Sequence, residues 1–145
     1  MFLAAYPQLV SGFRIGRFRA KAQTISKLET ELGRTLDAIG EFGEWRWGGG
    51  AAAHRLTKYY RGELTTVYLR AATVSATSRL PLVPDSKGTV VLMRAMGPLA
   101  FEAPNPKVVH PLLVYADLLL EGHARARDAA GEIFRRHLQV PSENP

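Results

Sequence analysis

The sequence predicts a single α/β (α+β) domain with a small mixed or antiparallel sheet, an N-terminal amphipathic helix and a C-terminal helical hairpin. The 145 residues are enough for one domain with a hydrophobic core and too few for two. Hydrophobic residues make up 46% of the chain and charged residues 22%, which is typical of a folded globular protein. Helix-like, strand-like and again helix-like segments follow one another, and this order indicates helices packed against a sheet.

A first helix is predicted over residues 25–39, where apolar residues recur at helical spacing and form one face. These residues are Ile25, Leu28, Leu32, Leu36 and Ile39. Ser26 and Glu29 stand in the Ser-x-x-Glu relation of a capping box, and Gly40 follows where a helix would end. The predicted helix therefore has a signal at both ends.

The next segment is predicted as a strand, a glycine turn and a helix. Residues 45–47 lead into Gly48, Gly49 and Gly50, and residues 51–56 have strong helix propensity. Free backbone amides in such a turn bind phosphate in glycine-rich loops. The spacing and the Lys-Ser/Thr pair of a P-loop are missing, so we favour the interpretation that the glycines allow close packing.

Three further strands are indicated by β-branched and aromatic residues. Residues 64–69 form the first, and residues 80–83 and 89–93 form the arms of a predicted hairpin. Residues 84–88, Pro-Asp-Ser-Lys-Gly, have the composition of the connecting turn. Pro81 places the first arm at the edge of the sheet, because proline cannot donate a ladder hydrogen bond.

The last third is predicted to be a helical hairpin. A buried helix begins at Pro111 and ends at Gly122, and a second amphipathic helix covers about residues 124–138. Asp117 lies within the apolar run of the first helix, where an unpaired charge is costly to bury. We expect it to pair with Arg125 or Arg127 of the second helix, or to be exposed.

Most catalytic chemistry lacks a sequence signal. The chain has no cysteine, which excludes disulfides, thiolate metal sites and cysteine nucleophiles. Its four histidines show no paired metal-ligand spacing, its aspartates form no Asp-x-Asp pair, and no Gly-x-Ser-x-Gly elbow is present. We therefore predict that the protein is not an enzyme and holds neither a cofactor nor a metal.

The net charge of +6 is unevenly distributed along the chain. Residues 1–28 contain no acid, residues 29–45 contain five, and residues 46–94 carry eight cations against two acids. Two basic surfaces that bind an acidic partner or nucleic acid are one interpretation, and a solvated surface that maintains solubility is the other. The candidate binding residues are Arg14, Arg17, Arg19, Lys21, Arg46, Arg55, Lys58, Arg61 and Arg70.

Three blocks of sequence resemble AbiEi-type antitoxins, the transcriptional regulators of type IV toxin–antitoxin systems. They are residues 16–19 (Gly-Arg-Phe-Arg), residues 47–57 with Tyr68, and residues 110–119 with Arg125 and residues 129–130. The resemblance assigns a structural role to Trp47, Gly48, Gly49, Tyr115, Asp117 and Arg125. Gly50 departs from the family pattern, which continues with a glutamate at this position.

The resemblance implies a cytoplasmic bacterial regulator that opposes a cognate nucleotidyltransferase toxin indirectly, with DNA as a second partner. Family members typically begin with a winged helix, and too little chain precedes Gly16 to build one. We therefore expect residues 1–24 to be a basic remnant of a DNA-binding part, residues 25–139 to be the antitoxin-type domain and residues 140–145 to be a flexible tail.

The N-terminus has no leading positive charge and no long apolar run, so it is a poor signal peptide, and no stretch has the ~18 apolar residues of a membrane span. The alternative function is a small phosphate- or nucleotide-binding enzyme that uses the turn formed by Gly48, Gly49 and Gly50. Oligomeric state has no sequence signal.

Overall fold

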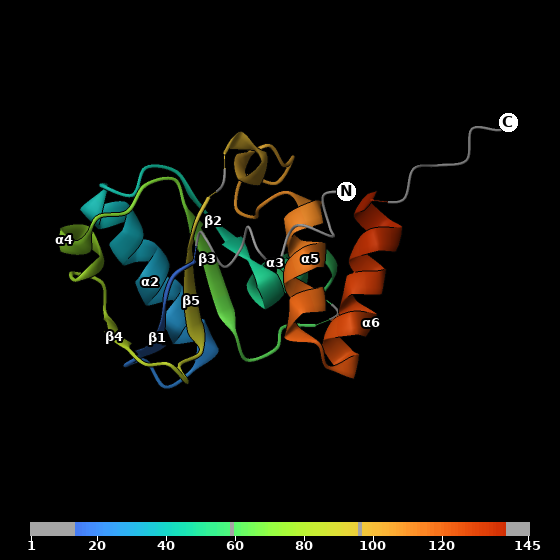
Figure 1. Cartoon of the computed structure of the whole chain (residues 1–145), viewed down its shortest axis with the longest axis horizontal. Coiled ribbons are helices and arrows are strands. Elements are labelled where there is room, and N and C mark those ends of the chain that lie inside the picture. The colour runs from blue at the N-terminus through green and yellow to red at the C-terminus, as the bar shows by residue number, and fades with distance from the viewer. Residues whose placement is uncertain (1–13, 59, 96, 139–145) are drawn as a thin grey trace, which may run out of the picture.

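The computed structural model describes residues 14–58, 60–95 and 97–138. Its elements, labelled in Figure 1, follow one another as β1 (Arg14–Ala20), α2 (Ile25–Ile39), β2 (Trp45–Gly48), α3 (Gly49–Thr57), β3 (Thr65–Leu69), α4 (Val74–Thr77), β4 (Leu82–Pro84), β5 (Val90–Arg94), the 3-10 helix η1 (Pro98–Phe101), α5 (Pro111–Glu121), α6 (Ala124–Ile133) and the π-helical turn η2 (Phe134–Leu138). The mixed α/β, single-domain fold class is confirmed.

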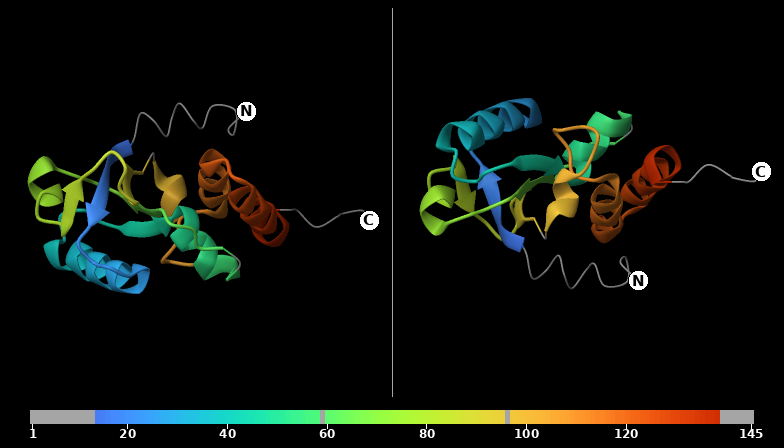
Figure 2. Two further views of the ribbon diagram at one scale, coloured as in Figure 1. Left: turned by 90° about the horizontal axis from the view of Figure 1, so that it is seen from below. Right: turned by 90° about the horizontal axis from the view of Figure 1, so that it is seen from above.

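A five-stranded mixed sheet forms the centre of the fold, with the strand order β2-β3-β5-β1-β4. Strands β3 and β5 are parallel, and the other neighbours are antiparallel. Helix α2 packs on one face of the sheet, and α5 and α6 lie beyond its β2 end (Figure 2). The described part of the chain contains no helix that is both long and apolar enough to cross a membrane.

The predicted hairpin of residues 80–83 and 89–93 is wrong, because β1 lies between its two arms. Phe18 of β1 pairs with Pro84 on one side and with Val90 on the other. Residues 84–88 do form a turn, but the turn closes around β1: the Asp85 amide donates to the Arg17 carbonyl at 3.0 Å, and Arg17 Nε donates to the Gly88 carbonyl at 2.5 Å.

Strand β1 itself was not predicted. Residues 14–20, which the sequence analysis assigned to a basic remnant, form an internal strand of the sheet whose Phe18 is buried. The basic residues of this strand mask its β-pattern, since only Ile15 and Phe18 are large and apolar. The sheet therefore contains chain on both sides of the expected boundary at residue 24.

Helix α2 has the predicted bounds but a different N-cap. The Thr24 hydroxyl, rather than Ser26, accepts the hydrogen bond from the Lys27 amide at 3.2 Å. The predicted capping box is wrong. The Glu29 carboxylate does not turn back to the helix N-terminus, because it binds Arg55 and Arg61 instead. Gly40 ends the helix as predicted, with a φ of 73°.

The helical hairpin of α5 and α6 is confirmed, and a histidine caps each helix. His110 Nδ1 accepts from the Leu112 amide at 3.0 Å, and His123 Nδ1 accepts from the Ala126 amide at 3.2 Å. Helix α5 was predicted to be a buried helix, but Leu119 and Leu120 near its end are 40% and 47% exposed.

Candidate binding groove between α2 and α3

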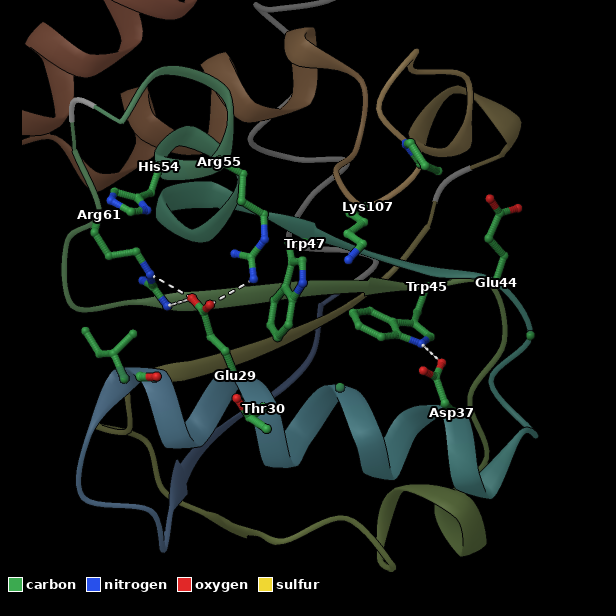
Figure 3. A pocket seen from close by; sticks show the side chains of 15 residues that line it. Glu29, Thr30, Asp37, Glu44, Trp45, Trp47, His54, Arg55, Arg61 and Lys107 are labelled. Carbon is green, nitrogen blue, oxygen red and sulfur yellow. Dashed lines mark hydrogen bonds and ion pairs between the residues drawn. The ribbon is translucent and has the colours of Figure 1, made fainter.

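An open groove of about 750 Å³ lies between α2 and α3, with β2 as its floor (Figure 3). One wall is the face of α2 that carries Glu29, Gly33 and Asp37. The opposite wall consists of α3, Arg61 after it, and Pro106 and Lys107 of the loop before α5. The volume is in the range of small-molecule sites, which makes this groove the candidate functional site.

Both tryptophans of the chain lie on the floor of the groove. Their rings meet edge to face, with centroids 5.2 Å apart and an interplanar angle of 90°. Trp45 Nε1 donates to Asp37 Oδ1 at 2.8 Å, which fixes the ring against α2. Gly33 permits this close approach, because a Cβ there would lie 3.3 Å from Trp45 Cη2. Trp47 is buried and Trp45 is half-buried.

At one end of the groove, Glu29 binds two arginines from the opposite wall. Its carboxylate lies 2.9 Å from Arg55 Nη2 and 2.7 Å from Arg61 Nη2. The Arg55 guanidinium also lies 4.8 Å from the Trp47 ring centroid. Burial alone raises the pKa of Glu29, but the hydrogen bonds from both arginines outweigh it, so this pKa lies below its usual 4.5.

Glu44 lines the other end of the groove, and it binds two arginines that are not among the lining residues: Arg46 at 2.9 Å and Arg70 at 3.2 Å. The Arg46 side chain is almost fully buried, and its Nη1 donates to three backbone carbonyls of the loop before α5: those of Ala103, Asn105 and Val108. Arg46 therefore ties this loop to β2. The hydrogen bond from Arg46 is the main reason that the pKa of Glu44 is lowered.

The structure divides the sequence-predicted cations of the middle segment into separate groups. Arg55 and Arg61 meet at Glu29, and Arg46 and Arg70 meet at Glu44. Lys58 is the exposed residue that ends α3. Four of these five cations thus neutralise acids of the acidic 29–45 segment, which the charge count along the chain did not reveal.

The basic residues around β1 lie apart from the arginines that bind Glu29 and Glu44. Arg17 is held by the Gly88 carbonyl, and Arg19 lies 3.8 Å from Asp85. Arg14 and Lys21 are exposed. Asp37, Trp45 and Lys107 were not predicted as site residues, because each becomes part of a site only when α2, β2 and the loop before α5 come together.

Asp117 joins the second and third of the three family-like blocks at one polar node. Its carboxylate accepts from the Tyr68 hydroxyl at 2.9 Å and from the Gly49 amide at 3.2 Å. The expected pairing with Arg125 or Arg127 is wrong, because Asp117 points from α5 toward the start of α3 and the sheet. A carboxylate at this position complements the positive end of α3.

The node also decides between the two interpretations of the glycine turn. Gly48, Gly49 and Gly50 are buried, and the Gly49 amide already donates to Asp117. A Cβ at Gly48 would lie 2.5 Å from Tyr68 Cε1, and one at Gly50 would lie 1.9 Å from the Arg61 carbonyl oxygen. The glycines therefore serve close packing, as favoured, and the turn is occupied by protein atoms where a phosphate would bind.

Replacing Tyr68 with phenylalanine is expected to lower the free energy of unfolding by about 1 kcal/mol, since the carboxylate of Asp117 loses one donor and keeps the Gly49 amide. Urea unfolding measures this change. Tyr115→Phe is the matched control: its ring stacks on Phe134, and its hydroxyl has no hydrogen bond among the described residues. Equal losses in both variants would contradict the structural role of the node.

Arg125 lies in another cluster, at the start of α6. Its guanidinium is 5.9 Å from the ring centroid of Tyr60, whose hydroxyl donates to Glu121 at 2.9 Å and lies 3.0 Å from His123 Nε2. Burial raises the pKa of Tyr60 to about 12, helped by the bond to Glu121, so the phenol keeps its proton. This cluster fixes the α5–α6 turn against the end of α3.

Among residues 14–58, 60–95 and 97–138, no three acidic or histidine side chains are close enough to hold a metal ion.

The fold and the groove place the protein in a structural class: a small, single-domain, mixed α/β protein with an open groove lined by aromatic and charged side chains. Residues 3–139 match the model of a family described as "Transcriptional regulator, AbiEi antitoxin, Type IV TA system". The chain belongs to this family, which confirms the resemblance. No curated protein and no solved structure matches it.

Proposed function

We propose that this chain acts as the antitoxin toward a cognate nucleotidyltransferase toxin, that it does so without catalysis of its own, and that the groove between α2 and α3 is its acting surface. Family membership over residues 3–139 supports the antitoxin role. The observation that points to the groove is its preformed geometry: both walls are held by charge pairs, and an open aromatic floor lies between them.

The exposed cations of the β1 region are the competing surface. Arg14, Arg19 and Lys21 are exposed, and they suit a nucleic-acid backbone better than the enclosed groups at Glu29 and Glu44. DNA binding through these residues is the second candidate. Because it uses another part of the molecule, one experiment separates the two surfaces.

The test is growth of cells that express the cognate toxin together with the full chain, its Lys107→Glu variant or its Lys21→Glu variant. We expect rescue by the unchanged chain and by Lys21→Glu, and loss of rescue with Lys107→Glu, because only the last reverses a charge in the groove. Thermal melts and soluble levels confirm that the three proteins fold equally. A chain that folds but never rescues would overturn the proposed antitoxin role, and loss of rescue only with Lys21→Glu would move the acting surface to β1.

A further inference from the structure

We infer that the groove between α2 and α3 binds a nucleotide unit, with its base on Trp45 and its phosphate at Lys107. The unit is either a free nucleoside monophosphate or one residue of a single-stranded nucleic acid. This inference deepens the proposed function, since it names the ligand of the proposed acting surface.

Charge in the groove is balanced in number, with the carboxylates of Glu29, Asp37 and Glu44 against the cations of Arg55, Arg61 and Lys107. Glu29 is paired with Arg55 and Arg61, and Glu44 is paired with Arg46 and Arg70, two arginines that are not among the lining residues. Lys107 carries the remaining positive charge, and its ammonium group has no ion pair or hydrogen bond among the described residues. Asp37 is the acid of the groove with no cationic partner in this part of the chain, since its bond is to Trp45. An anion in the groove is therefore expected at Lys107, whose charge no carboxylate among the described residues neutralises.

Lys107 is fixed in place through its backbone and free at its side-chain end. Its carbonyl accepts from the Trp47 amide at 2.9 Å, and its own amide donates to the Asn105 side chain at 2.9 Å. Figure 3 shows the side chain directed toward the two tryptophans. A cation held in this way provides a point contact for a phosphate group.

Trp45 provides a platform for a flat ring. Its N–H is bound by Asp37 Oδ1, its edge rests against Gly33, and it remains half-exposed toward the groove. Aromatic side chains stack nucleobases without selecting a sequence, because every base has a π-face. Asp37 Oδ2 has no hydrogen bond among the described residues and can accept from an exocyclic amino group, which favours adenine, cytosine or guanine over uracil.

The experiment uses the intrinsic fluorescence of the full chain, because its two tryptophans both lie in the groove and no others contribute. Excitation at the red edge of the indole band limits absorption by the added base. The titrants are AMP, UMP, adenosine, ribose 5-phosphate and an unstructured adenine tetranucleotide. We expect saturable quenching by AMP, and binding at least about tenfold weaker for ribose 5-phosphate, which lacks the stacking base.

Lys107→Ala is expected to weaken AMP binding about tenfold and to reduce its salt dependence. Lys87→Ala is the matched control, since it removes an exposed lysine from the turn beside β1, outside the groove, and we expect it to bind AMP unchanged. Clearly tighter binding of the tetranucleotide than of AMP would identify single-stranded nucleic acid as the source, and equal affinity would identify a free nucleotide.

Equal quenching by AMP and ribose 5-phosphate would overturn the inference in favour of a simple anion site. Absence of saturable quenching by both AMP and the tetranucleotide would overturn it altogether. Binding is measured without toxin, so nucleotide binding without rescue of growth contradicts only the antitoxin proposal, and rescue without nucleotide binding contradicts only this inference.

Discussion

Replacing Gly50 with alanine is expected to lower the free energy of unfolding by about 3 kcal/mol, the upper part of the range for overpacked interiors. A Cβ at this position would lie 1.9 Å from the carbonyl oxygen of Arg61 and 2.9 Å from its carbonyl carbon. These are backbone atoms that cannot rotate away as a side-chain end would. The Arg61 side chain also anchors this segment, through Glu29 and the Leu64 carbonyl. Alanine therefore forces α3 and the following loop apart.

Urea unfolding followed by far-UV circular dichroism measures the change, with Gly131→Ala as the matched control. Gly131 lies within α6, and a Cβ there would meet only the far end of the Arg135 side chain, at 3.4 Å. Alanine in a helix interior is favoured by up to about 1 kcal/mol over glycine, so the control is expected to be neutral or stabilising. Equal stability of the wild type and Gly50→Ala would refute the close approach of Arg61.

This contact also gives a physical reason for the glycine at position 50. The Arg61 carbonyl occupies the space that any side chain at this position would need. The same close approach brings Arg61 to Glu29 and so builds one end of the groove.

Replacing Glu29 with glutamine is expected to lower the free energy of unfolding by about 2 kcal/mol at neutral pH. Removing one partner of a buried ion pair costs about 3–5 kcal/mol, and the partial exposure of this carboxylate, 18%, reduces that cost. Two guanidinium groups with only 27% and 15% exposure lose their counter-charge. Chemical unfolding of both proteins measures the difference.

The stability lost in Glu29→Gln should shrink as the pH falls. The pKa of Glu29 in the folded protein is below its usual 4.5, so its contribution to stability is present above that value and disappears as the pH falls through the folded-state pKa. The difference between wild type and Glu29→Gln should therefore be full at pH 7 and should shrink below about pH 4.5.

Glu132→Gln is the control for this prediction, because Glu132 also binds two arginines and has a lowered pKa, but Arg135 and Arg136 are its neighbours within one turn of the same stretch of helix. These two ion pairs act within one continuous helical stretch, in which η2 directly follows α6. Their removal is expected to change stability far less than Glu29→Gln. A pH-independent loss in Glu29→Gln would show that packing, rather than charge, is responsible.

Much of the local structure was predictable, and the particular elements show why. The bounds of α2 match the prediction, and α5 ends at the predicted glycine. Residues 64–69 contain β3, and residues 84–88 form a turn as expected. In each case the signal is carried by residues within about one or two turns of one another: apolar periodicity, a proline at a helix start, or a glycine at its end.

The sites were predictable only in part. The sequence singled out Arg55 and Arg61 as candidate binding residues, and the family resemblance singled out Gly49 and Asp117 as structural ones. It did not show that Glu29 would form ion pairs with both arginines. Nor did it show that Asp117 would accept hydrogen bonds from Gly49 and Tyr68 rather than pair with Arg125. A charged residue finds its partner by position in space, and up to 68 residues separate these partners along the chain.

The sequence by itself therefore determined the fold class, most helices and the family. Only the tertiary structure decided that β1 separates β4 from β5, and that Trp45, Asp37 and Lys107 share one groove. The physical reason is the range of the interactions. Helix caps and periodicity act between near neighbours, whereas strand order and groove walls depend on which distant segments exclude water together, and no local pattern contains that information.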